Sequence, residues 1–86
     1  MLINYQTDLP GYSAKAHIYD AEGHLVKRLV NNDLLGTNGF FRWDGDTDDG
    51  SKAPVGVYII WLQLFHPTEA KTITEKMVCV LAGRLD

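Results

Sequence analysis

A single cysteine, three prolines and the lack of a long hydrophobic run limit what this chain can be. Because Cys79 is alone, a disulfide within the chain is impossible, and cysteine content says nothing about the redox environment. No segment reaches the ~18–20 consecutive apolar residues that a membrane-spanning helix needs. The first ten residues include Asn4, Gln6, Asp8 and Pro10, which is not the pattern of a signal peptide.

Basic residues are also few. Eight lysines and arginines stand against eleven aspartates and glutamates, so the net charge is −3, and the basic residues are scattered along the chain. This distribution argues against nucleic acid or an anionic membrane surface as the partner. A hydrophobic content of 45% is typical of a globular protein. With 86 residues there is room for one core, and we predict a single domain over residues 1–86.

The hydrophobic residues repeat with a period of two rather than 3.6, which predicts strands and no helices. Apolar Ala14, Ala16 and Ile18, for example, alternate with Lys15, His17 and Tyr19. We expect strands at residues 2–7, 14–20, 24–31, 40–44, 56–66 and 71–82. The turn at 20–23 provides Gly23 for a position with positive φ, so residues 14–31 are predicted to form a hairpin. Six or seven short strands predict an all-β chain folded as an antiparallel β-sandwich.

The segment WDGDTDDGSKAPVGVY, residues 43–58, places four aspartates within six positions. They are Asp44, Asp46, Asp48 and Asp49. The first three have the opening spacing of a calcium-binding EF-hand loop, but Asp49 stands where that loop needs glycine and Val55 stands where it needs glutamate. Aspartates and glycines are also the usual residues of turns, where they cap backbone N–H groups and adopt positive φ. We favour a turn, and a calcium site of another kind stays open as the alternative; no other cofactor is expected.

Candidate catalytic residues do not form a recognisable set. His17, His24 and His66 are dispersed, and none has the spacing of a metal-ligand pair. Cys79 lies between two valines in a predicted strand, where a thiol is usually a small buried hydrophobe. We therefore predict no catalytic residues and no enzymatic activity.

Two groups of residues, taken together, carry a resemblance to a known family. Ile18, Tyr19, Asp20, Gly23 and Val26 match the first hairpin of its pattern, and Trp43, Asp44, Gly45, Gly50, Pro54, Gly56, Val57 and Tyr58 match its later strand and turn. This arrangement resembles the FlgD-type immunoglobulin-like domains, and within them the C-terminal domains of secreted or cell-surface Bacteroidetes proteins, including lamin-tail-containing ones. The resemblance implies an immunoglobulin/fibronectin-III-like β-sandwich without catalytic activity.

The same resemblance implies structural roles for the residues of the acidic segment. Trp43 would fill the core, and the carboxylate of Asp44 would accept backbone N–H bonds, with the other aspartates in solvent. Gly45, Gly50 and Gly56 would set the turns that precede Tyr58. For the core as a whole we predict Ile18, Tyr19, Trp43, Tyr58, Ile60, Leu62 and Met77.

The segment at 56–66 is apolar on both of its faces, which a sandwich strand usually is not. Ile59, Trp61 and Phe65 share the face opposite to the predicted core. Three explanations stay open: the N-terminal segment or a loop covers them, they pack on a neighbouring domain or a second copy, or the aromatic rings form a sugar-binding platform. We predict that these three residues form an interaction surface.

The expected function is that of a non-catalytic structural or interaction module, the C-terminal part of a larger exported or cell-surface bacterial protein. Its partners would be neighbouring domains of that protein, components of the cell surface or secretion apparatus, or a second copy of the chain. A role in secretion or surface attachment is implied by the resemblance. The alternative is a carbohydrate-binding module with structural calcium held by Asp44, Asp46, Asp48 and Asp49.

Overall fold

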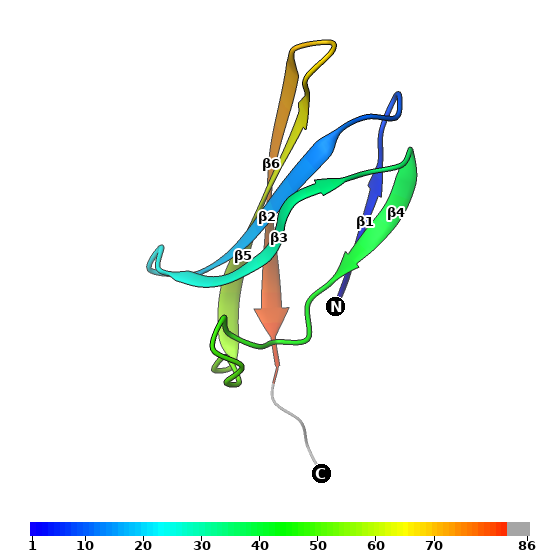
Figure 1. Cartoon of the computed structure of the whole chain (residues 1–86). Helices are drawn as coiled ribbons and strands as arrows, with labels where there is room; N and C mark the ends of the chain where they lie inside the picture. Colours follow the sequence, from blue (N-terminus) through cyan, green and yellow to red (C-terminus); the bar gives the residue numbers. More distant parts are fainter. Residues whose placement is uncertain (83–86) are drawn as a thin grey trace.

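The chain forms two antiparallel β-sheets of unequal size (Figure 1). The computed structural model describes residues 1–82, and the tail at 83–86 lies outside the described residues. The strands are β1 (Leu2–Gln6), β2 (Ser13–Asp20), β3 (Leu25–Leu34), β4 (Asn38–Arg42), β5 (Gly56–His66) and β6 (Lys71–Leu81). The larger sheet has the order β3-β2-β5-β6, and β1 pairs with β4 in the smaller one. Within residues 1–82 there is no helix that is long and apolar enough to cross a membrane.

The strand positions follow the period-two pattern of the sequence. In β2, Ala14, Ala16 and Ile18 are fully buried, while the residues between them are half-buried on the other face. The all-β class and the six strands predicted from the sequence are therefore confirmed, with each strand within about three residues of its expected bounds.

The β2–β3 hairpin forms where it was predicted. Gly23 has a φ of 89° and donates its N–H to the carbonyl of Asp20 at 3.0 Å. One carboxylate oxygen of Asp20 also accepts the N–H groups of Glu22 and His24, at 2.9 and 2.8 Å. β3 continues to Leu34, three residues past the expected end. Its pairing with β2 extends through the residues predicted as a turn, because register shifts interrupt the pairing without ending it and Asn32 takes a φ of 60°.

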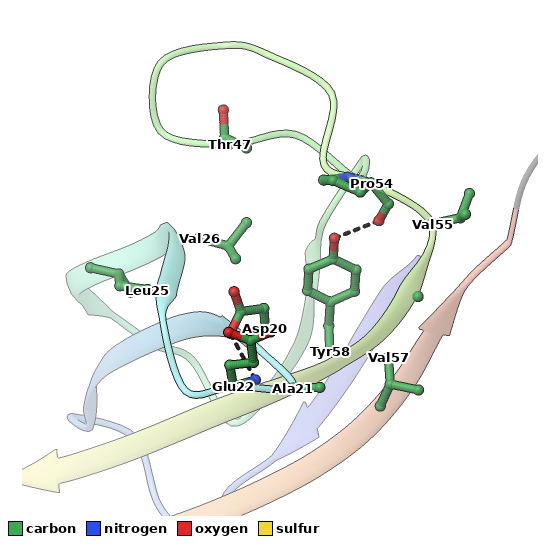
Figure 2. A pocket seen from close by; sticks show the side chains of 11 residues that line it. Asp20, Ala21, Glu22, Leu25, Val26, Thr47, Pro54, Val55, Val57 and Tyr58 are labelled. Carbon is green, nitrogen blue, oxygen red and sulfur yellow. Dashed lines mark hydrogen bonds between the residues drawn. The ribbon is translucent and has the colours of Figure 1, made fainter.

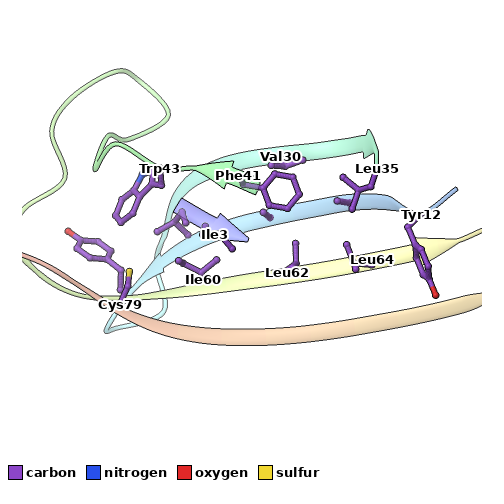
Figure 3. Packing of buried hydrophobic residues seen from close by; sticks show 14 of the residues in the cluster. Ile3, Tyr12, Val30, Leu35, Phe41, Trp43, Ile60, Leu62, Leu64 and Cys79 are labelled. Carbon is purple, nitrogen blue, oxygen red and sulfur yellow. The ribbon is translucent and has the colours of Figure 1, made fainter. Parts of the chain in front are cut away.

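The core lies between the two sheets (Figure 3). Its largest fully buried side chains are Trp43, Tyr12, Ile18 and Ile60. The ring of Trp43, which is 1% exposed, meets the ring of Tyr58 edge-on at 5.2 Å, and its Nε1 donates to the carbonyl of Asp46 at 2.9 Å. Residues from both sheets thus close around one indole.

Five of the seven predicted core residues are buried: Ile18, Trp43, Tyr58, Ile60 and Leu62. Met77 is only partly buried and packs against the edge of the core. The prediction for Tyr19 was wrong. Because side chains of a strand alternate between its faces, Tyr19 cannot point inward next to the fully buried Ile18, and it lies on the outer face of the larger sheet.

Replacing Trp43 with alanine should destabilise the fold severely. The substitution removes the largest buried side chain and leaves a cavity between the sheets, a change that typically costs about 3–5 kcal/mol. Urea unfolding followed by circular dichroism measures the loss. Phe40→Ala is the matched control, because the Phe40 side chain is 60% exposed and its loss should cost less than about 0.5 kcal/mol. Equal losses in the two variants would contradict this account of the core.

Candidate functional site

The four aspartates of the acidic loop point to four different partners. Asp44 accepts a hydrogen bond from Arg42 Nε at 2.7 Å, and Asp46 accepts one from Lys27 Nζ at 2.6 Å. The other two carboxylates accept backbone N–H groups: Asp48 that of Arg28 at 2.9 Å, and Asp49 that of Ser51 at 3.1 Å. The repulsion expected from four neighbouring carboxylates is therefore offset by two lysine or arginine partners on β3 and one at the end of β4.

The predicted role of Asp44 was wrong. Its carboxylate is 62% exposed and contacts Arg42, two residues away, rather than backbone N–H groups. Asp46 and Asp48, which were expected to be solvated, instead tie the loop to β3. The sequence could not reveal this, because Lys27 and Arg28 lie about twenty positions earlier in the chain and come close only when the sheet forms.

The predicted glycines do set the turns of this loop. Gly45, Gly50 and Gly56 have φ angles of 76°, 88° and 152°, which residues other than glycine rarely adopt. Two backbone bonds complete the tight turn: Thr47 donates to the carbonyl of Ser51, and Gly50 donates to that of Thr47. This is the turn that the sequence favoured.

The loop offers little to a metal ion. Calcium prefers six to eight oxygen atoms that converge on one point, whereas these carboxylates diverge and are already paired. In the part of the chain that the structure describes, no three His, Cys, Asp or Glu side chains are grouped so that they could hold a metal ion. The carboxylates of the loop are thus engaged by groups of the protein itself, and the absence of bound calcium stays a prediction.

A shallow cavity of about 440 Å³ opens beside this loop (Figure 2). Both of its hydroxyl groups are already engaged: the Tyr58 hydroxyl donates to the Pro54 carbonyl, and Thr47 Oγ1 contacts Asp49. Asp20, at the rim, accepts the backbone bonds of the β2–β3 turn. The lining therefore presents acidic and apolar groups without a free nucleophile next to a base.

Cys79 is also no candidate nucleophile. The residue is buried in the core at the level of Tyr58, its partner across the strands. Burial raises the pKa of the Cys79 thiol, so that the reactive thiolate is disfavoured. The side chain is a small buried hydrophobe, as predicted.

The outer face of the larger sheet carries an uncovered group of apolar side chains. We call Val57, Ile59, Trp61, Val78 and Val80 the outer apolar patch. The strand register places Val57 opposite Val80 and Ile59 opposite Val78, so these residues of β5 and β6 are direct neighbours. Val78 is 72% exposed and Val80 is 66% exposed, whereas Ile59 and Trp61 are half-buried between their neighbours. The patch is thus contiguous and open to solvent.

Trp61 is held in place by an aromatic neighbour on β2. Its ring lies 5.2 Å from that of His17, with an angle of 40° between the planes. The Nδ1 atom of His17 in turn lies 3.4 Å from the Tyr19 hydroxyl. Burial lowers the pKa of His17, and the charges of Arg28 and Lys15 lower it further, which keeps the imidazole neutral at pH 7. The indole is therefore supported by an uncharged surface.

Phe65 does not join this group. Gln63 separates it from Trp61 along β5, and its partners across the strands are Ser13 and Thr72. Its side chain is 44% exposed at the far end of the strand. The structure thus brings Ile59 and Trp61 together and leaves Phe65 isolated.

Val57, Val78 and Val80 were not among the residues predicted for the interaction surface. Val57 lies on the same face of β5 as the predicted Ile59 and Trp61. The signal was present in the sequence: Val78 and Val80 lie on the polar face of the last strand and interrupt its pattern. One of the three open explanations is wrong in part. The N-terminal segment packs on the inner face, where Tyr5 lines the same cavity as Leu62 and Leu64, and so it cannot cover Trp61.

Replacing Asp46 with asparagine should reduce stability in a pH-dependent way. The hydrogen bond from Lys27 holds the pKa of Asp46 below its ordinary value of 3.8. A carboxyl group whose pKa is lower in the folded state stabilises the fold above the unfolded pKa, and this contribution disappears as the pH falls through the folded pKa. The variant should therefore unfold at lower urea than the wild type at pH 7, and the difference should shrink below pH 3.8.

The matched control is Asp44→Asn. This carboxylate is more exposed and pairs only with a neighbour in sequence, so its loss should have little effect at either pH. The account of the loop would be wrong if both variants lost stability to the same extent and with the same pH dependence.

Calcium should leave the stability of the chain unchanged. A ligand that binds only the folded state stabilises it by RT ln(1 + [L]/Kd) and so raises the melting temperature once its concentration exceeds Kd. We therefore expect the same melting temperature by circular dichroism in millimolar calcium and in chelator. A rise of several degrees with calcium, absent from Asp46→Asn, would restore the calcium site that the sequence left open.

Comparison with known proteins leaves the family of this chain as a prediction. Searches against protein-family models, curated proteins and solved structures found no match to it. The residues that carry the resemblance to FlgD-type domains nevertheless occupy defined places. Gly23 and Asp20 form the β2–β3 turn, and Trp43 and Tyr58 pack together in the core. What the geometry itself establishes is an all-β chain of two antiparallel sheets with an apolar outer surface.

Proposed function

We propose that this chain is a non-catalytic, immunoglobulin-like interaction module of an exported or cell-surface bacterial protein. The outer apolar patch is its binding surface, and the partner is another protein: a neighbouring domain or a component of the cell surface or secretion apparatus. The small sheet and the acidic loop keep the larger sheet rigid. Binding then uses a preformed surface and costs little conformational entropy.

The observation that carries this proposal is the contiguity of the patch. Single exposed hydrophobic residues are normal on protein surfaces, but contiguous apolar groups are rare and mark interaction sites. Here four side chains from β5 and β6 face one another directly across the strands, and Trp61 adjoins them. An isolated sandwich with this face in water would leave valines 66% and 72% exposed side by side.

The composition of the patch and its border is typical of a protein–protein interface. Such interfaces have an apolar centre, often with a tryptophan, and a polar rim. Lys76 and Thr74 on β6 and Lys15 on β2 flank Trp61 and Gln63, which gives the patch a polar boundary on one side. Trp61 is accordingly the residue expected to contribute most to binding.

The immunoglobulin-like identity is supported by the path of the chain. β1 and β4 form one sheet and β2, β3, β5 and β6 the other, so the β1–β2, β3–β4 and β4–β5 connections cross from sheet to sheet, as connections do in Greek-key sandwiches. The exported location rests on the sequence resemblance alone. Fractionation of the bacterium that produces the protein, with detection by antibody, tests the location separately from binding.

A photo-crosslinking experiment tests the binding surface. The crosslinking amino acid p-benzoylphenylalanine replaces Val78 in the patch, and in a matched control it replaces Thr74 on the same face of the same strand. In the producing bacterium, position 78 should give one strongly enriched protein partner that position 74 does not give. Adding Trp61→Glu should abolish this product, because a carboxylate would be buried at the interface.

Equal crosslinking from positions 74 and 78, or crosslinking that survives Trp61→Glu, would contradict the proposal. A glycan array separates the carbohydrate-binding alternative. Sugar binding that is lost in Trp61→Ala would replace protein binding as the function of this face.

A further inference from the structure

The smaller sheet ends in an unpaired strand edge at β1. Met1 and Trp43 exchange two hydrogen bonds, from each nitrogen to the other oxygen, at 2.9 and 3.0 Å. In an antiparallel pair such residues alternate with residues whose N–H and C=O groups point the opposite way. The backbone groups of Leu2, Asn4 and Gln6 therefore point away from β4, toward a side where no strand within residues 1–82 is paired with β1.

This edge lacks the features that protect other edges. Natural proteins usually protect an exposed edge strand with charged residues or proline. Of the four edge strands in the described part of the chain, β3, β4 and β6 each contain lysine or arginine, whereas β1, Leu2–Gln6, contains no charged residue and no proline. Its bare edge is thus open to pairing with another strand.

An apolar groove runs along the same edge. It contains a cavity of about 180 Å³, with residues 4–6 of β1 as one wall. Its other lining residues include Leu62 and Leu64 of β5 and Ile73 and Met77 of β6. An apolar cavity of about 150 Å³ holds a benzene molecule, so a groove of this volume has room for a large apolar side chain. The inner face of β6 extends beyond the cover of the small sheet, and Ile73 is 38% exposed there.

We propose that β1 accepts an extended strand of another polypeptide, which pairs with its free edge and fills this groove. The backbone of the incoming strand would bond to Leu2, Asn4 and Gln6, as in known cases of strand addition to a sheet edge. Every second side chain would point into the groove, onto Ile73 and Met77. The smaller sheet would become three-stranded and would cover the inner face of β6.

The chemistry of the groove defines the incoming segment. It is apolar at alternate positions, because its inward side chains meet leucine, isoleucine and methionine. Glu75 lies among these residues on β6 and favours a lysine or arginine in the incoming strand. The outward positions are polar, since they would lie beside the exposed Asn4 and Gln6.

A second folded copy of this chain does not fit. Its β1 is already packed on its own larger sheet, and pairing two such strands edge to edge would bring that sheet into the space occupied by β6. The incoming strand must therefore come from a segment that is not part of a folded sandwich. This surface is distinct from the outer apolar patch, so failure of one proposal leaves the other intact.

Nuclear magnetic resonance with a synthetic peptide tests the inference. The probe is a capped seven-residue peptide that alternates valine with threonine and carries one lysine in place of a valine, so that the lysine points into the groove toward Glu75. We expect it to bind the chain, to shift the amide signals of Leu2, Asn4 and Gln6, and to slow their hydrogen exchange. A peptide with the same sequence but N-methyl groups on alternate residues lacks the backbone donors and should bind at least ten-fold more weakly.

Asn4→Pro provides the sharpest variant. Proline removes an N–H that is unpaired in the fold, and such edge positions tolerate proline. The variant should fold and lose at least ten-fold in peptide affinity. Phe40→Pro is the matched control, since Phe40 is the register partner of Asn4 and its N–H points to the opposite edge; its affinity should equal that of the wild type.

Ile73→Lys, which alters the groove without touching β1, gives an independent result if a proline variant does not fold, and it should also weaken binding at least ten-fold. The inference is overturned if the peptide does not bind the chain. It is also overturned if the N-methylated peptide binds the chain as tightly as the probe does, or if the probe binds the Ile73→Lys variant as tightly as the wild type. It is equally overturned if the protected amides lie on the free edge of β6 instead of on β1.

Discussion

The buried indole of Trp43 holds together parts of the fold that are far apart in the sequence. Its backbone exchanges both hydrogen bonds with Met1, its ring meets Tyr58 in the opposite sheet, and its Nε1 fixes the Asp46 carbonyl at the start of the acidic turn. Because the same residue contacts both sheets and the loop, the loop cannot shift without disturbing the packing between the sheets. The carboxylate of Asp46 then links the loop to β3, because it accepts a hydrogen bond from Lys27.

The unequal size of the two sheets leaves part of the inner face of the larger sheet uncovered. A two-stranded sheet cannot cover four strands, so it shields β2 and β5 and leaves the inner face of β6 partly open. The outer face of the larger sheet has no covering layer within residues 1–82, and there Trp61 and Val78 face solvent or their strand neighbours. The two apolar surfaces of the molecule thus lie on opposite faces of the same two strands: the inner one is open because the smaller sheet is too narrow, and the outer one because it faces away from that sheet.

Local patterns explain most of what the sequence could predict. Alternation placed Ile18, Ile60 and Leu62 in the core, and glycine at position 23 located the hairpin, because both signals depend on neighbouring residues only. Apart from Tyr19, which the alternation of β2 itself places on the outer face, the errors concern contacts between distant residues. Asp44 and Asp46 are indistinguishable by sequence, and only the approach of Lys27 gives Asp46 its role. The exposure of Val78 was not predicted either: the valine interrupts the polar face of β6, but the pattern alone does not show whether another layer covers that face.

The edges of the sheets argue that the two surfaces have different partners. The outer apolar patch is a flat array of side chains on the face of β5 and β6 that points away from the smaller sheet. On this face a partner meets side chains rather than backbone groups, which suits a folded surface. The β1 edge offers the opposite combination: free backbone groups with a narrow groove beneath them, which a folded surface cannot enter. An extended segment can satisfy both, and it would bury Ile73 and Met77 without competing for Trp61.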